Sequence, residues 1–196
     1  MHEAIGDGSP LSPQVCFETH IIAESQIDAL LDERIRNTLC RCFPAARDTF
    51  SVSRAWHGSS PAWTVLTIAA DDAIAGHVGI VDRTIQAADK HLRVGGIQNV
   101  CVTPEHRGQG LLDRILTRTL CHIFDEGMDA GLLFCTEALV KVYARYGWRL
   151  LEGASVCRIT ENGDGAPLPS GSVAMWAPVY LNVWPAGPIH LAGNDW

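Results

Sequence analysis

A glycine-spaced basic turn is the part of this sequence whose residue types and spacing are best suited to chemistry. It reads Val100-Cys-Val-Thr-Pro-Glu-His-Arg107-Gly-Gln-Gly110-Leu-Leu112 and joins a β-rich run to an amphipathic helical pattern. Glycines at 108 and 110 permit positive φ angles and a close approach of the main chain to a ligand. The free N–H groups at the start of the following helix, together with the charge of Arg107, would then face an anion. The stretch therefore predicts a backbone site for a pyrophosphate.

Two common phosphate-binding turns do not fit this stretch. A P-loop requires Gly-Lys-Ser/Thr after the last glycine, whereas Leu111 and Leu112 follow Gly110 here. A dinucleotide-binding turn requires three glycines at G-x-G-x-x-G spacing, and the third glycine is absent. Because glycine-spaced turns are weak signals alone, an ordinary strand-to-helix turn stays open as an alternative.

The elements that must position this turn follow from the spacing of apolar residues. Helical periodicity predicts a helix that is capped by Ser25 and ends near Pro44, then helices at 111–126 and 137–146. Runs rich in β-branched and aromatic residues predict strands at 14–22, 63–70, 74–85, 92–102, 131–135, 156–160 and 173–181. The adjacent glycines at 95 and 96 indicate a bulge or a close backbone approach.

This order of elements predicts an α/β (α+β) fold in one domain over residues 1–196, with a mixed central sheet of about seven strands flanked by helices. Residues 1–13 are expected to form a flexible head. The segment 44–61 has no clear periodicity and is expected to be a substrate-facing loop.

The turn and the order of elements resemble the GCN5-related N-acetyltransferases, whose coenzyme A turn reads Arg or Gln, two residues, Gly, one residue, then Gly or Ala. Arg107 and Gly110 match this pattern, and Leu112 departs from its last position. The resemblance covers residues 15–181 and implies an acetyl-CoA-dependent N-acetyltransferase. It also implies that backbone N–H groups of residues 100–102 pair with the pantetheine and stabilise the oxyanion. The implied coenzyme-binding residues are Val100, Cys101, Val102, Arg107, Gly108, Gln109, Gly110, Leu111 and Leu112.

A second motif, Tyr143-Ala-Arg-Tyr-Gly-Trp148, resembles the family's tyrosine that precedes a Gly-Phe or Gly-Trp step and is commonly the general acid. A tyrosine hydroxyl, whose pKa is about 10, can protonate the departing thiolate, so Tyr143 is the expected acid. Packing alone is the alternative role for this side chain. A glutamate of one sub-family aligns with Gln98, which cannot accept a proton at neutral pH but can orient a water or the amine. Asp82, Glu137 and His77 are unranked substitutes for the base.

The end of the chain, Ala192-Gly193-Asn194-Asp195-Trp196, resembles the tail of the aminoglycoside 2′-N-acetyltransferases, which also end on tryptophan and use that terminus in the sugar site. The resemblance implies that residues 182–196 line the substrate site. The α-carboxylate and Asp195 would contact a substrate ammonium, and the Trp196 indole would stack on a sugar ring. Asp82 and Glu137 are further candidate substrate contacts. The implied substrate is a small cationic amino sugar such as kasugamycin, acetylated at its 2′-amine to give antibiotic resistance; a frayed tail is the alternative.

Composition limits the expected binding partners and the expected cellular compartment of the protein. The net charge of −7 and the lack of a basic stripe argue against nucleic acid as a partner. No apolar run reaches membrane-helix length and the start has no leader pattern, so we expect a cytoplasmic protein that does not bind a membrane. Seven cysteines without a Cys-x-x-Cys pair predict no metal site.

The family resemblance makes a homodimer the expected assembly. Three other functions stay open. A peptide or protein N-acetyltransferase would need an extended groove, and a nodulation-type acyltransferase would need a long apolar tunnel. A non-catalytic acyl-CoA sensor would keep the turn without the acid.

Overall fold

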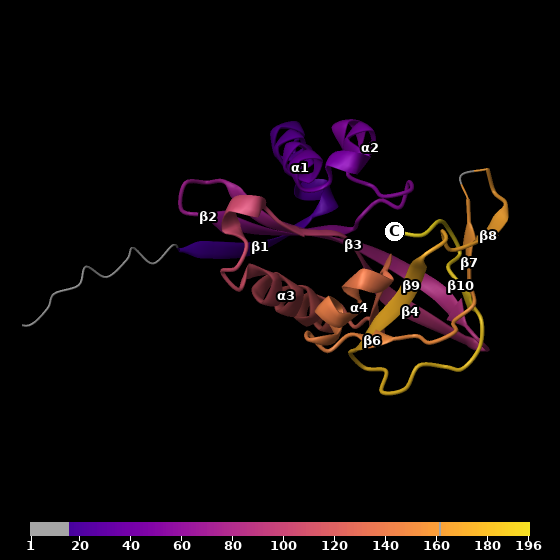
Figure 1. Ribbon diagram of the computed structural model, residues 1–196. Helices are drawn as coiled ribbons and strands as arrows, with labels where there is room; N and C mark the ends of the chain where they lie inside the picture. The colour runs from indigo at the N-terminus through magenta and orange to yellow at the C-terminus, as the bar shows by residue number, and fades with distance from the viewer. Residues whose placement is uncertain (1–15, 161) are drawn as a thin grey trace, which may run out of the picture.

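An antiparallel meander forms the first half of the structure, a computed structural model that describes residues 16–160 and 162–196 (Figure 1). Each strand pairs antiparallel with the next in the order β1 (Phe17–Ala23), β2 (Trp63–Ala69), β3 (Ile74–Ala87) and β4 (Lys90–Val102). The first half of β3 is buried on both faces and its second half alternates. The burial pattern changes along β3 because the helices cover only the first half of the strand.

Among the described residues, the four α-helices cover the two faces of the sheet (Figure 1). The helices α1 (Ala29–Cys42) and α2 (Arg47–Val52) join β1 to β2 and lie on one face. On the opposite face, α3 (Leu111–Asp125) and α4 (Glu137–Ala144) flank β5 (Ala130–Thr136) in the chain. Apolar residues of α3 recur at helical spacing and are buried: Leu111, Ile115, Leu116 and Ile123.

The second half of the chain adds strands on both sides of the meander. The strand β5 pairs parallel with β4, and β9 (Ser172–Pro178) pairs antiparallel with β5. Four short strands complete the sheet: β6 (Arg149–Leu150), β7 (Val156–Ile159), β8 (Gly165–Pro167) and β10 (Ile189–His190). The strand order is β6-β9-β5-β4-β3-β10-β7-β8, with β2 and β1 extending from β3. Thus β10 brings the end of the chain back between β3 and β7.

The strands β4 and β5 separate after a short parallel contact. They pair only where residues 94–96 face residues 130–132. Beyond that point, β4 remains paired with β3, while β5 remains paired with β9. The edge of β4 that faces β5 is therefore unpaired within the described sheet, and its backbone groups are open to an extended ligand.

A bulge lies in β4 next to this separation. Gln98 faces Gly79 and Cys101 faces His77, so two β4 residues oppose one β3 residue. Asn99, the first of the two, has a φ of 53°. The expected bulge is thus displaced from the glycine pair at 95 and 96 to residues 99–100.

The glycine pair instead permits close packing, which was the other interpretation of these residues. A Cβ on Gly95 would lie 2.5 Å from Ile123 Cδ1, and one on Gly96 would lie 2.2 Å from Trp196 Cε2. Helix α3 packs on one glycine, and the last residue of the chain packs on the other. No larger residue fits either position without movement of the packed side chain.

Three sequence predictions need correction. Asp28, rather than Ser25, caps α1, because Asp28 Oδ1 accepts a hydrogen bond from the Leu31 N–H at 2.8 Å. The segment 44–61 contains α2 as well as a loop, and its helix is too short to show periodicity. Within residues 16–160 and 162–196 the sheet has ten strands instead of about seven, because β6, β8 and β10 are too short to be recognised by alternation.

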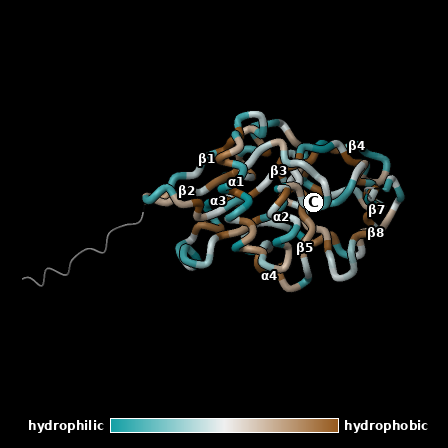
Figure 2. The backbone as a smooth tube through the Cα atoms, turned by 90° about the horizontal axis from the view of Figure 1, so that it is seen from above, coloured by the Kyte–Doolittle hydropathy of each residue, from teal (hydrophilic) through white to brown (hydrophobic). Residues whose placement is uncertain are grey.

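The mixed α/β class itself is confirmed. Hydrophobic segments gather in the central strands, and the marked C-terminus lies within the outline of the molecule rather than at its edge (Figure 2).

The predicted head, residues 1–13, lies outside the described residues. Within the described ranges, no helix has the length and apolar character needed to cross a membrane.

Candidate active site

Two cavities lie where β4 and β5 separate. The first, which we call the turn cavity, has a volume of about 490 Å3 and is lined by the glycine turn, the end of β4 and one side of α4. The second, which we call the tail cavity, has a volume of about 440 Å3 and contains Asp195 and Trp196 in its wall. Residues 97–100 of β4 and 133–136 of β5 form opposite sides of the tail cavity.

The glycine turn has the backbone conformation that its sequence predicts. Gly108 and Gly110 have φ angles of 76° and 74°, in the left-handed region that favours glycine. A Cβ on either residue would meet nothing within 4 Å, so conformation rather than space selects glycine here. Gly110 is the N-cap of α3, whose first N–H groups are therefore free for an anion.

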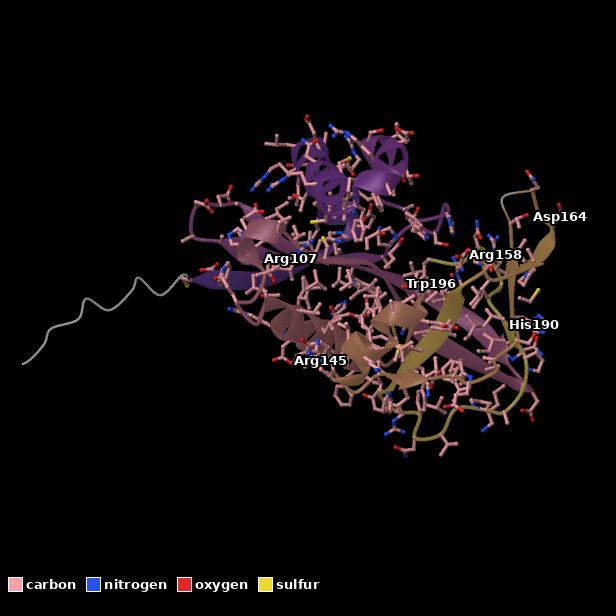
Figure 3. The ribbon with its side chains drawn as sticks, in the orientation of Figure 1. Arg107, Arg145, Arg158, Asp164, His190 and Trp196 are labelled. Atoms are coloured by element: carbon pink, nitrogen blue, oxygen red, sulfur yellow. The ribbon has the colours of Figure 1, made fainter. Side chains whose placement is uncertain are left out.

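Basic side chains surround the turn cavity. Arg107 is exposed and donates from Nε to the Val102 carbonyl at 3.2 Å. Arg145, which the sequence analysis did not select, also lines this cavity from the end of α4. Figure 3 shows both arginines, one on each side of α3. Gln109 is exposed and does not line the cavity.

The remaining expected coenzyme residues lie along the cavity wall. Val100, Val102, Leu111 and Leu112 line the turn cavity together with the glycines. Cys101 also lines it but is buried, and a hydrogen bond with the Cys42 thiol, reinforced by burial, raises the pKa of Cys101. Its thiol is thus unsuited to act as a nucleophile.

Four residues line both cavities and form the wall between them: Phe43, Val100, Leu139 and Tyr143. Tyr143 is held edge-on to the Trp148 ring, with ring centroids 6.2 Å apart. Burial raises the pKa of Tyr143 well above its usual value, and the nearby Cys135 and Cys101 thiols add to the effect. The hydroxyl therefore keeps its proton at neutral pH, as a general acid requires.

Gln98, the expected aid to the base, is buried and lines the tail cavity. Its Oε1 accepts from the Trp56 N–H at 2.8 Å, and its Nε2 donates to the Ser59 carbonyl at 2.7 Å. Both ends of the amide thus hold the turn at residues 56–59. Direct contact of Gln98 with a substrate amine stays a prediction.

The three substitutes for the base lie outside both cavities. His77 is buried on β3, and its Nδ1 donates to the Asn99 carbonyl at 2.9 Å. Burial lowers the pKa of His77 to about 4, so this ring is neutral at physiological pH. Asp82 accepts two hydrogen bonds from Arg93, at 2.9 and 2.7 Å, and Glu137 is exposed at the start of α4. These placements do not support substrate contacts by Asp82 or Glu137, because neither residue lines a cavity.

The C-terminal tail is anchored inside the molecule. Only 3% of Trp196 is exposed, and its indole Nε1 donates to the Leu132 carbonyl at 3.3 Å. The ring packs on Phe134, at 5.1 Å between centroids, and beneath the guanidinium of Arg83 at 5.0 Å. The expected stacking of this indole on a sugar needs correction, because protein groups already cover the ring.

Asp195 also lines the tail cavity, and its side chain is 5% exposed. Its Oδ2 lies 2.9 Å from Nδ1 of His57. Its Oδ1 lies 3.2 Å from Arg158 Nη1, within ion-pair range but without hydrogen-bond geometry. In Figure 3, Arg158 lies next to Trp196. His57 itself lines the cavity, and the sequence analysis missed it because a single histidine in an irregular segment has no recognisable pattern.

Comparison with known proteins decides the family. A family model described as an acetyltransferase (GNAT) domain matches residues 30–151. The chain belongs to this acetyltransferase family. It is therefore a GNAT-type N-acetyltransferase whose acetyl donor is acetyl-CoA. Arg107 and Gly110, which match the family's turn pattern in sequence, line the turn cavity. No curated protein sequence matches the chain.

Several solved structures share the fold of this chain at low sequence identity. The GNAT N-acetyltransferase YhbS of Escherichia coli, solved in complex with CoA, is 16% identical, with a TM-score of 0.66 over 93% of each chain. Escherichia coli ElaA is 14% identical, with a TM-score of 0.58 over 83% of this chain and 99% of that one. A GNAT acetyltransferase of Staphylococcus aureus is 11% identical, with a TM-score of 0.53 over 83% of this chain and 99% of that one.

Proposed function

We propose that this acetyltransferase moves the acetyl group of acetyl-CoA, bound in the turn cavity, to a primary amine bound in the tail cavity. The observation that carries the proposal is the wall that the two cavities share. Val100 and Tyr143 belong to both cavities, so a thioester at this wall is within reach of an amine from the other side. Tyr143 then donates a proton to the departing thiolate.

The coenzyme has contacts of three kinds in this proposal. The N–H groups at the start of α3, with Arg107, bind the pyrophosphate. Arg145 adds a positive charge at the same cavity. The pantetheine lies along the unpaired edge of β4, where N–H groups of residues 100–102 pair with its amides and stabilise the oxyanion.

The lining of the tail cavity favours an amine attached to an apolar body. Its walls are mostly aromatic and aliphatic, with rings from Phe43, Phe50, Trp56, Phe134 and Tyr143. Among the described residues of the lining, only Asp195 has an acidic side chain, and it lies beside Arg158 and His57. A ligand with one amine and an apolar flank matches this lining better than a polycation does.

An aminoglycoside such as kasugamycin, acetylated at its 2′-amine, is the second candidate substrate. One observation favours it: the acidic side chain of Asp195, which suits a substrate ammonium, lines the tail cavity beside Trp196. A role in antibiotic resistance would follow from this substrate.

The test is coenzyme A release from acetyl-CoA against a panel of amines, with product mass to confirm one added acetyl group. The panel contains arylalkylamines, kasugamycin, gentamicin-type aminoglycosides and peptides with free N-termini. Turnover highest with arylalkylamines supports the apolar acceptor, and turnover with one aminoglycoside supports the second candidate. Turnover with peptides alone contradicts both substrates. A lack of turnover with bound acetyl-CoA contradicts the transfer proposal itself.

A further inference from the structure

A tight turn at residues 56–59 presents His57 to the tail cavity. The Ser59 N–H donates to the Trp56 carbonyl at 2.9 Å, and the two residues form a β-bridge. The central residues His57 and Gly58 have φ angles of 45° and 76°. Such a turn requires positive φ at both central positions, which is unfavourable for histidine and persists only where the surroundings hold it.

Both neighbours of this turn hold it in place. From β4, Gln98 bonds the backbone of Trp56 and Ser59. From the tail, Asn194 Nδ2 donates to the His57 carbonyl at 2.9 Å, and Ser59 Oγ donates to the Asp195 carbonyl at 2.9 Å. The turn is thus fixed between the central sheet and the end of the chain.

The His57 ring is oriented by two contacts. Its Nδ1 lies 2.9 Å from Asp195 Oδ2, and the Trp56 ring packs against it at a tilt, with centroids 4.8 Å apart. Because the carboxylate of Asp195 accepts, Nδ1 carries the proton in the neutral ring and Nε2 keeps its lone pair. About a third of the His57 side chain is exposed, against 5% of Asp195. The free nitrogen therefore belongs to the accessible member of the pair.

We infer that His57 is the general base of the transfer reaction and that Asp195 is a positioning residue that sets its tautomer. This inference rests on the proposed function, in which an amine occupies the tail cavity. His57 and Tyr143 line that same cavity, so the base and the acid act on one bound amine. A base with an orienting carboxylate and a separate acid is the arrangement that acyl transfer to an amine needs.

The reaction removes two protons from the substrate ammonium. His57 Nε2 takes one proton from the substrate ammonium, and the freed nitrogen lone pair forms the C–N bond to the thioester carbonyl carbon. The C–S bond then breaks and its electron pair leaves with the sulfur. The Tyr143 hydroxyl delivers a proton to the thiolate, and the second proton that leaves the nitrogen restores that hydroxyl. The proton on Nε2 passes to solvent, so the products are the amide, coenzyme A and one proton.

The charges that face His57 come from three elements. Asp195 contacts it from the tail, Arg158 on β7 lies behind that carboxylate, and Arg83 on β3 donates to Ser59 Oγ at 3.1 Å. Burial lowers the pKa of Arg83, with Asp195 opposing the shift. Asp195 therefore lies between the His57 ring and the Arg158 guanidinium.

The first test needs no substrate. Long-range 1H–15N NMR correlations report which ring nitrogen of each histidine carries the proton. We expect neutral His57 to be protonated at Nδ1 in the wild-type chain, and Asp195→Asn to shift it toward the Nε2-protonated form. A wild-type ring protonated at Nε2, or an unchanged tautomer in Asp195→Asn, overturns the inference.

The second test measures transfer to the best amine of the panel. We expect His57→Ala to lower kcat by about 100-fold or more, with little change in the KM of acetyl-CoA. Added imidazole should restore part of that activity, which loss of a merely structural side chain does not allow. The matched control is His20→Ala, because His20 pairs with Glu18 at 3.4 Å on β1, outside both cavities.

The two arms separate the inference from the function on which it rests. A kcat of His57→Ala equal to that of His20→Ala, or loss without imidazole rescue, overturns the base assignment while the transfer proposal stands. A wild-type chain that acetylates no amine contradicts the transfer proposal, and the tautomer measurement still decides whether Asp195 sets the His57 ring.

Discussion

Replacing Gly96 by alanine tests how the tail is held against the sheet. The new Cβ would lie 2.2, 2.5 and 2.6 Å from three atoms of the Trp196 indole, distances at which some group must move. The indole cannot move freely, because the Leu132 carbonyl, Phe134 and Arg83 hold it. Gly96→Ala therefore strains either β4 or the tail.

The size of the effect follows from comparing these two responses. Expelling the indole would expose about 150–250 Å2, which costs about 4–6 kcal/mol. Overpacking strain in a core is typically about 1–3 kcal/mol, so the chain should keep the indole and accept the strain. We expect the free energy of unfolding, measured by urea denaturation, to fall by about 2 kcal/mol.

Two further variants make this measurement decisive. Gly165→Ala is the matched control, because its Cβ would meet only Cys157 Sγ at 3.6 Å, an ordinary contact. Trp196→Ala removes the atoms that the new methyl would strike, so adding Gly96→Ala to it should cost little more. A coupling free energy of about 2 kcal/mol is expected between the two positions. Additive losses, or a Gly96→Ala variant as stable as Gly165→Ala, would refute the reasoning.

Three more predictions concern the acid, the coenzyme turn and a buried histidine. Tyr143→Phe should lower kcat by about 100-fold or more while acetyl-CoA binding persists, whereas Tyr180→Phe, at a residue that lines neither cavity, should not lower kcat. Arg107→Ala should raise the KM of acetyl-CoA by about tenfold and leave that of acetyl-pantetheine, which lacks the pyrophosphate, unchanged. Since burial lowers the pKa of His77 to about 4, below its unfolded value of 6.5, the unfolded chain binds the extra proton between these values. The contribution of His77 to the free energy of unfolding should therefore be complete above pH 6.5 and about 2 kcal/mol smaller at pH 5. Denaturation of the wild type and of His77→Asn, at pH 5 and at a pH above 6.5, measures this difference.

Each of these predictions has a contradicting result. Equal kcat values for Tyr143→Phe and Tyr180→Phe would contradict the assignment of Tyr143 as the general acid. An equal rise in KM for acetyl-CoA and for acetyl-pantetheine in Arg107→Ala would contradict a contact of Arg107 with the pyrophosphate. For His77, the same pH dependence in the wild type and in His77→Asn would show that other groups control acid stability.

Much of the fold can be predicted from local sequence, because long elements repeat their apolar pattern many times. The helix predicted at 111–126 is found as Leu111–Asp125, and its glycine turn has the predicted positive φ angles. The long strands β3 and β4 are likewise found where β-branched runs predict them. The strands β6 and β10, with two residues each, contain too few residues for any period to be seen.

The bulge in β4 shows a second limit. Two adjacent glycines are a reasonable sign of a bulge, yet here they make room for Ile123 and Trp196. The bulge forms at Asn99 instead, where the carbonyl accepts from His77 and the side-chain amide donates to the Arg54 carbonyl at 2.8 Å. Those partners lie 22 and 45 residues away in the chain, so no local window contains the cause.

Both limits, short strands and contacts between distant residues, apply to the tail cavity, where the acceptor amine is proposed to bind. His57 and Asp195 are 138 residues apart, and the contact between them depends on β10, which inserts between β3 and β7 and turns the tail back toward the cavity. Gly96 is the sheet residue that lets the tail end there, since any side chain would occupy the place of the indole. Family resemblance can place the tail near a substrate, but it cannot find a histidine that only tertiary contacts bring to Asp195. For this reason eight of the nine expected coenzyme residues, which lie in the consecutive stretch 100–112, line the turn cavity, whereas the pairing of His57 with Asp195 could not be predicted.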